Sequence, residues 1–303
     1  MPTQVELTTA GRDQRRWSLT ANTLKASIEQ ARWIVLAFAI IGAILETWGA
    51  QIHQANPAFA QILGYAGAAV LGIAAVVRQA RLGHERMQAW IMARAGSESL
   101  KREMYLFRAP AGPYASGNSC LTLLSRKDQI LAKLRPYQKY RVEVEGELNV
   151  PGPLNTEEYL ESRITGAKGQ IKYFEDRAYR YARAQKLLSG AEFVLAMIAA
   201  LLGAAITMTD KQAYGAWVAV ITTISGAITS HMLAQRYEQL TISFRVTADR
   251  LESTKNHWNS MGETDLAQLV ESCEAVLLEE NQGWIAGADD TAVPTRVKAS
   301  PPP

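Results

Sequence analysis

The sequence predicts an all-α membrane protein with four transmembrane helices arranged as two hairpins. Three observations predict it: four long apolar runs, their grouping into two pairs, and basic residues gathered outside the short loops. The runs cover 33–50 and 58–77 in the first pair, and 187–209 and 212–235 in the second. About 20 apolar residues form a helix that crosses a hydrocarbon core of about 30 Å, and a helix satisfies the backbone of such a segment in lipid.

The first and third runs each contain one acidic residue. Glu46 lies near one end of the first run, and Glu192 lies six residues after Lys186. The eight Ile, Leu, Val and Phe side chains of the first run offset, at about −0.3 to −0.6 kcal/mol each, a charge that costs about 3 kcal/mol at the bilayer centre. Intramembrane acids are functional candidates. In a symmetric assembly they would form carboxylate rings that favour cations; alternatively, they reach the headgroup region and stay hydrated.

The distribution of basic residues predicts the orientation. Every Lys and Arg except Lys211 lies outside the hairpin loops 51–57 and 210–211. The positive-inside rule then places both termini and the middle segment in the cytoplasm. This distribution argues against a soluble protein with buried core helices. It predicts a multi-pass protein of the inner (cell) membrane whose partner is the lipid bilayer. The net charge of +3 does not suggest nucleic acid, since the basic residues follow the membrane edge.

Each half of the chain is predicted to contain an approach helix, a membrane hairpin and a returning helix that continues into the cytosol. The halves are residues 1–150 and 151–286, and a polar, proline-ended tail predicted to be disordered covers 287–303. In the second half, apolar steps of three and four predict one uninterrupted helix over 157–209, capped by Asn155 or Thr156.

The same apolar steps continue beyond the fourth run. The long cytosolic extensions are therefore predicted to pack as an antiparallel, coiled-coil-like pair within a helical bundle. Further helices are predicted over 119–134 and 264–281.

No catalytic pattern occurs in the sequence. Phosphate-binding, dinucleotide-binding, zinc-protease and serine-hydrolase motifs are absent, and the four histidines fall in separate segments. We therefore expect no enzyme activity, no cofactor and no metal. Cys120 and Cys273 are distant from one another and are expected to be unpaired thiols.

The fourth run carries a polar face formed by Thr222, Ser225 and Thr229, which are spaced three and four residues apart. Such a face either lines a water-filled pore or packs against a neighbouring helix through its small side chains and hydroxyls. Gly64, Ala68 and Gly72 on the second run fit helix packing alone.

Aromatic and charged residues recur on the predicted helices of both halves. They are Tyr159, Arg163, Tyr173, Tyr237, Trp258 and Trp284 in the second half, and Trp90, Arg94, Glu98, Lys101 and Gly112-Pro113-Tyr114 in the first. In these motifs the chain resembles the SLATT family, the SMODS- and SLOG-associating two-transmembrane effectors of bacterial conflict systems. Residues 155–285 are similar to the first subtype, and residues 10–150 to the third. The first-subtype positions are expected to be helix-packing anchors rather than ligand contacts.

The resemblance implies an effector that forms pores or disrupts the membrane when a nucleotide-linked sensor is triggered. No such sensor is fused to this chain, so a separate sensor protein is the implied partner, or the cytosolic helices receive the signal directly. Four spans of modest polarity are too few to enclose a pore alone, so we expect a homo-oligomer. The alternative is a non-conducting membrane scaffold that docks cytosolic partners.

Overall fold

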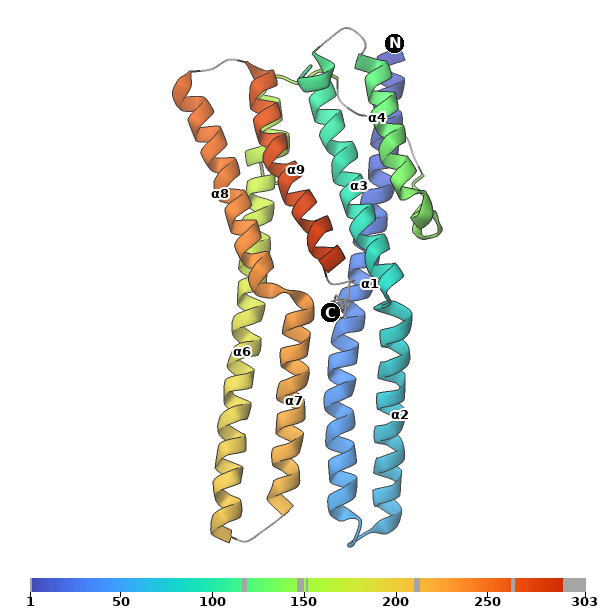
Figure 1. Cartoon of the computed structure of the whole chain (residues 1–303), viewed down its shortest axis with the longest axis vertical. Coiled ribbons are helices and arrows are strands. Elements are labelled where there is room, and N and C mark those ends of the chain that lie inside the picture. The colour runs from blue at the N-terminus through green and yellow to red at the C-terminus, as the bar shows by residue number, and fades with distance from the viewer. Residues whose placement is uncertain are drawn as a thin grey trace, which may run out of the picture. The chain divides into compact units, whose positions relative to one another are not determined.

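The structure is a computed structural model that describes residues 2–115, 119–145, 150, 152–209, 213–262 and 265–290. No strand occurs among these residues. The larger helices (Figure 1) are α1 (Pro2–Ile52), α2 (Pro57–Arg81), α3 (His84–Arg108), α4 (Ser119–Leu134), α6 (Gln170–Thr209), α7 (Ala213–Gln235), α8 (Tyr237–Met261) and α9 (Leu266–Asp290). The short elements are 3-10 turns at Gly112–Tyr114 and Arg135–Tyr140, helix α5 (Thr156–Tyr159) and a π-helical turn at Leu160–Thr165.

The chain divides into two compact units. One, here called the hairpin unit, contains residues 26–83 and 176–242. The other, here called the polar unit, is formed by residues 1–25, 84–175 and 243–303. Each unit draws on both halves of the sequence, and the domain boundaries expected from the sequence stay a prediction.

The hairpin unit contains the four predicted spans. In it, α1 runs beside α2, and α6 runs beside α7 (Figure 1). The α2 helix begins at Pro57, where the Asn56 side chain accepts a hydrogen bond from the Phe59 N–H at 3.1 Å. Gly42 permits the close approach of α1 and α2, because a Cβ there would lie 2.6 Å from the side chain of Leu71.

The two hairpins share a small core inside this unit. Its buried members are Leu36 of α1, Leu188 of α6, Ile228 of α7 and Tyr237 at the start of α8. Outside this core the helices present apolar side chains outward, and Leu187 and Met208 of α6 are 74% and 84% exposed. Outward-facing apolar side chains of this size and number are typical of a lipid-facing surface.

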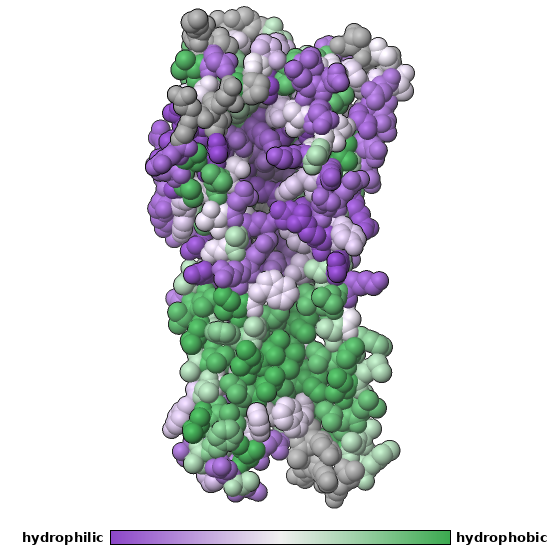
Figure 2. Space-filling view, turned by 180° about the vertical axis from the view of Figure 1, so that it is seen from behind, coloured by the Kyte–Doolittle hydropathy of each residue, from purple (hydrophilic) through white to green (hydrophobic). Residues whose placement is uncertain are grey.

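The described residues contain four helical stretches long and apolar enough to cross a membrane: Gln4–Ile52, Pro57–Arg81, Thr156–Met208 and Gly215–Ser260. On the face that Figure 2 shows, the surface of the hairpin unit is mainly hydrophobic, whereas that of the polar unit is mainly hydrophilic. The predicted fold class, an all-α membrane protein with four spans, is confirmed.

In the polar unit, α3 packs against both α4 and α9. The beginning of α1 joins them, because Gln14 donates a hydrogen bond from Nε2 to Ser97 Oγ at 3.1 Å. Small residues of α3 make close packing possible: Ala89 and Ala93 are fully buried, and a Cβ on Gly96 would lie 2.5 Å from the Leu134 side chain. The unit is thus a helical bundle whose members come from both halves of the chain.

The prediction of one uninterrupted helix over 157–209 is wrong. The predicted cap at Asn155 starts α5, but residues 166–169 separate the following π-helical turn from α6. Two glycines close this corner tightly: a Cβ on Gly166 would collide with the backbone oxygen of Glu161, and one on Gly169 would lie 2.5 Å from that of Ile164.

A second break separates α7 from α8, where one continuous helix was expected. Arg236 has a φ of 53°, in the left-handed region that costs a non-glycine residue about 1–2 kcal/mol. Near the C-terminus, α9 continues to Asp290 and so includes the first residues of the predicted tail. Residues 291–303 lie outside the described part of the chain.

Candidate functional site

Among the described residues, the largest fully buried side chain is that of Arg163, in the π-helical turn that follows α5. Its guanidinium donates two hydrogen bonds to Glu274 of α9, from Nε to Oε1 at 2.8 Å and from Nη2 to Oε2 at 3.0 Å. Arg163 is 2% exposed and Glu274 is not exposed at all. Tyr159, also fully buried, donates its hydroxyl to Glu274 Oε1 at 3.4 Å. Two-bond geometry of this kind is the strongest form of an arginine–carboxylate pair.

The elements on either side hold this pair in place. A reciprocal capping box fixes the start of α5: the Asn155 side chain accepts from the Glu158 N–H, and the Glu158 carboxylate accepts from the Asn155 N–H. Tyr159 then contacts the ring of Tyr105 edge-on at 5.7 Å, and the guanidinium of Arg163 lies over the same ring at 5.0 Å. The ring of Tyr105 on α3 therefore packs against both Tyr159 and Arg163.

Further charges of α3 surround the pair. Glu98 approaches Arg163 Nη1 at 3.6 Å, and Lys101 lies nearby. Burial alone would raise the pKa of Glu98, but the positive charges of Lys101 and Arg163 outweigh it and lower that pKa below its ordinary value. Burial alone would lower the pKa of Arg163, but the negative charge of Glu274 outweighs this effect and raises that pKa above its ordinary value. Both groups are therefore ionised at neutral pH.

A second set of contacts joins α3 to α9. Arg94 Nη2 donates to Glu280 Oε1 at 3.1 Å, and Asn281 Nδ2 donates to the Ala95 carbonyl at 3.3 Å. Arg94 and Glu98 belong to the motif positions of the first half, whereas Arg163 belongs to those of the second half. The structure therefore brings the motif positions of both halves into one charged cluster, which we call the α3–α9 clasp.

The clasp leaves almost no free space. A cavity of about 10 Å³ lies beside it, lined by Glu98, Ser99, Arg102, Arg163, Glu274, Leu277, Leu278 and Asn281. Such a volume holds no more than one water molecule. Tyr159 and Arg163 thus lie in a tightly packed, charged environment, and their role as packing anchors stays a prediction.

The Gly112-Pro113-Tyr114 motif has a similar role next to the clasp. Tyr114 is buried and donates its hydroxyl to Glu103 Oε2 at 2.6 Å, while its ring meets Phe107 edge-on at 5.6 Å. Gly112 has a φ of 55°, a conformation that favours glycine. The glycine thus supplies the turn that returns Tyr114 onto α3.

In the hairpin unit, the predicted polar face of α7 points outward. Thr222 and Thr229 are exposed and Ser225 is half-buried. The Thr222 hydroxyl donates to the Val218 carbonyl at 2.9 Å, so it is satisfied by its own helix. Gly226 lies on the same side, and a Cβ there would meet no atom within 4 Å. Within the described part of the chain this face is therefore largely exposed, although Thr229 contacts another helix.

The structure brings one of the two predicted acids to this face. The Thr229 hydroxyl shares its one proton between Oε1 of Glu192 on α6 and the Ser225 carbonyl of its own helix, which lies 3.0 Å away. Glu46 lies instead on α1 against α2, where a Cβ on Gly67 would lie 3.0 Å from its Cγ and Oε1. The acids thus occupy different hairpins, and Glu192 alone joins the residues proposed for the pore wall.

An aromatic and polar joint connects the two hairpins at one end of α7. Arg32 Nη1 of α1 donates to Gln235 Oε1 at 2.7 Å, and the rings of Trp33 and His231 lie 4.6 Å apart. Tyr237 brings its hydroxyl within 3.5 Å of His231 Nε2, directly beside the break at Arg236. Tyr237 is buried in this joint, and its role as a packing anchor stays a prediction.

The other motif positions lie away from these contacts. Tyr173 is 36% exposed and meets Phe174 edge-on, and Trp258 of α8 is half-buried. The side chain of Trp284 lies outside those that the structure describes. Their role as packing anchors stays a prediction.

Sequence reasoning missed Glu274 and the joint around His231. Glu274 interrupts the apolar face of α9, between Val270, Cys273 and Leu277, all buried. A charged residue on the buried face of an amphipathic helix is the signal that points to an internal partner. The identity of that partner, Arg163, has no local signal.

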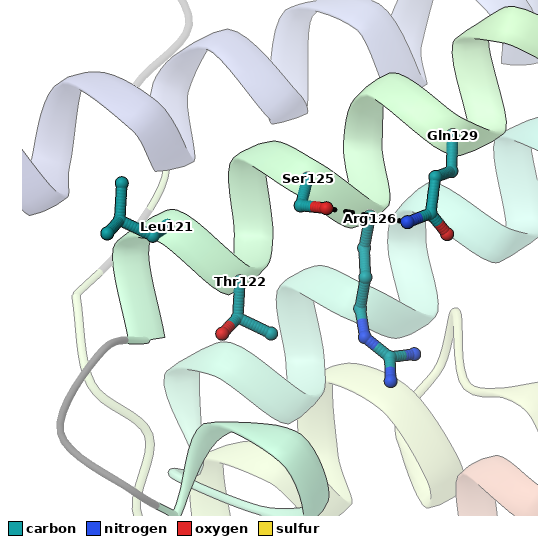
Figure 3. Close-up of a pocket in the computed structure, with 5 residues that line it drawn as sticks. All are labelled: Leu121, Thr122, Ser125, Arg126 and Gln129. Atoms are coloured by element: carbon teal, nitrogen blue, oxygen red, sulfur yellow. Dashed lines mark hydrogen bonds between the residues drawn. The ribbon is translucent and has the colours of Figure 1, made fainter.

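An open depression on α4 (Figure 3) is lined by Leu121, Thr122, Ser125, Arg126 and Gln129. Its one charged side chain, Arg126, already lies 3.6 Å from Glu103. Among the described residues, no group of three or more His, Cys, Asp or Glu side chains is placed to hold a metal ion.

Two family models match the chain. Residues 159–284 match the SMODS and SLOG-associating 2TM effector domain 1. Residues 15–120 match a protein family of unknown function (DUF4231). No curated protein and no solved structure matches the chain.

Proposed function

Because the chain belongs to the SLATT family and carries its domains in tandem, we propose that this membrane effector of conflict systems acts by forming an oligomeric pore. The second domain is a two-transmembrane effector domain by family, and the four apolar helical stretches agree with a membrane protein. That this effector acts by forming a pore is our proposal.

One observation carries the proposal: the polar face of α7 is largely exposed within the described part of the chain. Exposed Thr222 and Thr229, together with the Glu192 carboxylate, would face hydrocarbon in a monomer. Polar and ionisable groups in a membrane face a bundle interior or a water-filled cavity. Several copies arranged with α7 innermost would remove this face from lipid and surround a wet path.

The polar unit is the natural place for control of such a pore. Its α3–α9 clasp holds α5 and the corner that precedes α6, and α6 carries Glu192. A partner that loosened or strengthened the clasp would change the constraint on α6. We propose that this partner is a separate, nucleotide-linked sensor protein. We also propose that the present chain lies in the inner membrane with both of its termini in the cytoplasm.

The test is ion efflux from liposomes that contain the purified protein. The triple variant Thr222→Val, Ser225→Val and Thr229→Val removes the hydroxyls of the face at similar volume. We expect it to suppress potassium efflux while insertion and oligomer mass stay unchanged. The double variant Thr47→Val and Thr207→Val removes hydroxyls from α1 and α6 and should conduct normally.

Efflux through the triple variant at the unmodified rate, from an intact oligomer, would contradict the proposed pore wall. A smaller oligomer mass for the triple variant would instead identify this face as a packing surface, with a loss of about 0.6 kcal/mol per interhelical hydrogen bond. An intact oligomer of the unmodified protein that never conducts would favour the scaffold function.

A further inference from the structure

Glu192 is held at the polar face of α7 by a specific contact. It lies six residues beyond Lys186 in α6, a rise of about 9 Å along the helix axis. Its neighbours along the chain are apolar, and Phe193, Val194 and Met197 are all more than half exposed. The hydrogen bond from Thr229 turns its carboxylate toward α7 instead of toward the side that Phe193 occupies.

This hydrogen bond leaves most of the carboxylate unsatisfied. An ionised carboxylate has about four acceptor positions, and one hydroxyl occupies one of them. Among the described side chains, no ion pair to Glu192 occurs, and the residue is only half-buried. The remaining positions need water or a cation, because an ionised acid in contact with hydrocarbon costs about 2.5–3.5 kcal/mol.

We propose that Glu192 makes the pore cation-selective, so that monovalent cations are the ions that this membrane effector conducts. The inference rests on the proposed pore function. In an oligomer the Glu192 carboxylates of the chains form a ring of negative charge on the conduit, which attracts cations and repels anions. Glu192 is the specificity-determining residue, and Thr229 positions its carboxylate.

Glu46 provides a matched control. It is the other intramembrane acid, but it lies on α1 against Gly67 of α2. Changing it to glutamine removes the same charge from the same membrane unit, without touching the α7 face. A selectivity effect confined to Glu192 therefore reports position rather than total charge.

The first experiment records current across planar bilayers under a KCl gradient. The unmodified protein should give a reversal potential close to that of potassium. Glu192→Gln should conduct with a reversal potential near zero, whereas Glu46→Gln should behave like the unmodified protein. A reversal potential that Glu192→Gln leaves unchanged, or an unmodified pore that prefers chloride, would overturn the inference.

A second experiment needs no current. In a Cys120→Ser background, Ser225→Cys introduces a thiol one helical turn from Thr229. Its rates of reaction with a cationic and with an anionic thiosulfonate reagent are compared, with and without Glu192→Gln. We expect the ratio of the cationic rate to the anionic rate to be about fivefold higher when Glu192 is present. The reason is that a unit negative charge about 8 Å away in water attracts the cationic reagent and repels the anionic one.

The outcomes separate the two proposals. If the introduced thiol reacts with neither reagent, no water reaches this face, and the pore and the selectivity fail together. If it reacts with both, but with a rate ratio that does not depend on Glu192, the wet conduit stands and the selectivity inference alone is overturned.

Discussion

The guanidinium of Arg163 and the carboxylate of Glu274 form a two-hydrogen-bond ion pair between residues 111 positions apart in the sequence. The pair is completely enclosed by α3, α5 and α9, and Tyr159 supplies a further hydrogen bond. Desolvation of the two charges offsets much of their attraction. The pair therefore specifies which helices meet more than it adds to the stability of the fold.

Arg163→Met should lower the free energy of unfolding by about 3–5 kcal/mol, because it leaves Glu274 buried without a counter-charge. Combining it with Glu274→Leu should recover most of that loss, since an apolar pair of similar volume is often neutral. Urea unfolding of detergent-solubilised protein, followed by far-UV circular dichroism, measures both. Losses that simply add in the double variant would show that the two side chains are not coupled.

Cys273 should resist alkylation in the folded protein. Burial and the neighbouring charge of Glu274 raise the pKa of the Cys273 thiol to about 12. An ordinary cysteine thiol is about half ionised at pH 8.5. Because the pKa of Cys273 is raised, the ionised fraction of its thiol at that pH is about a thousandfold smaller. Mass spectrometry after maleimide treatment should find Cys120 labelled before Cys273, and both labelled in denaturant. Rapid labelling of Cys273 in the native protein would mean that the α9 packing opens.

Gly166→Ala should destabilise the corner between the π-helical turn and α6. Its new methyl group would overlap the Glu161 backbone oxygen, and such crowding costs about 1–3 kcal/mol. Gly190→Ala, in a helical position with no atom within 4 Å of the new Cβ, should be neutral or stabilising. The midpoints of urea unfolding compare the two, and equal midpoints would argue against a tight corner.

Ala68→Leu should weaken self-association. Gly64 and Gly72 flank Ala68 on one face of α2, and a Cβ on either glycine would meet no atom of the same chain within 4 Å. Small residues at this spacing permit close approach of membrane helices. Ala69 lies on the neighbouring face, which carries exposed Ile62 and Tyr65. The control variant Ala69→Leu should therefore leave the oligomer intact. Mass measurement in detergent decides, and a monomeric unmodified protein would count against the oligomer.

Reporter fusions at residue 54 and after residue 284 should report opposite sides of the membrane, with the latter cytoplasmic. The reason is the placement of all Lys and Arg except Lys211 outside the hairpin loops. A phosphatase and a fluorescent-protein reporter at each site measure the side directly. Both fusions on one side would contradict the four-span topology.

The membrane helices and several boundaries could be predicted from the sequence, because apolar runs, charges and prolines are local signals. The α4 helix covers the predicted 119–134, and α7 begins within one residue of the predicted span. The break at 166–169 was hidden because the three- and four-residue apolar steps continue across it, although Gly166 and Gly169 close the corner. The break at Arg236 depends on a left-handed backbone conformation that no glycine marks.

The candidate site was only partly readable for a different reason. Thr222, Ser225 and Thr229 lie on one helix, so their spacing alone places them on one face. The partners of Arg163 and Thr229 belong to other helices, and a single sequence contains no information that selects Glu274 or Glu192 among the acidic residues. Such pairings follow from tertiary packing.

The most direct measurement is a cryo-electron microscopy structure of the protein assembled in lipid nanodiscs. We expect several copies around an axis, with α7 innermost, Thr222 and Thr229 facing the axis, and Glu192 forming a ring within the span. A monomer, or an assembly in which the polar face of α7 points toward lipid, would contradict it.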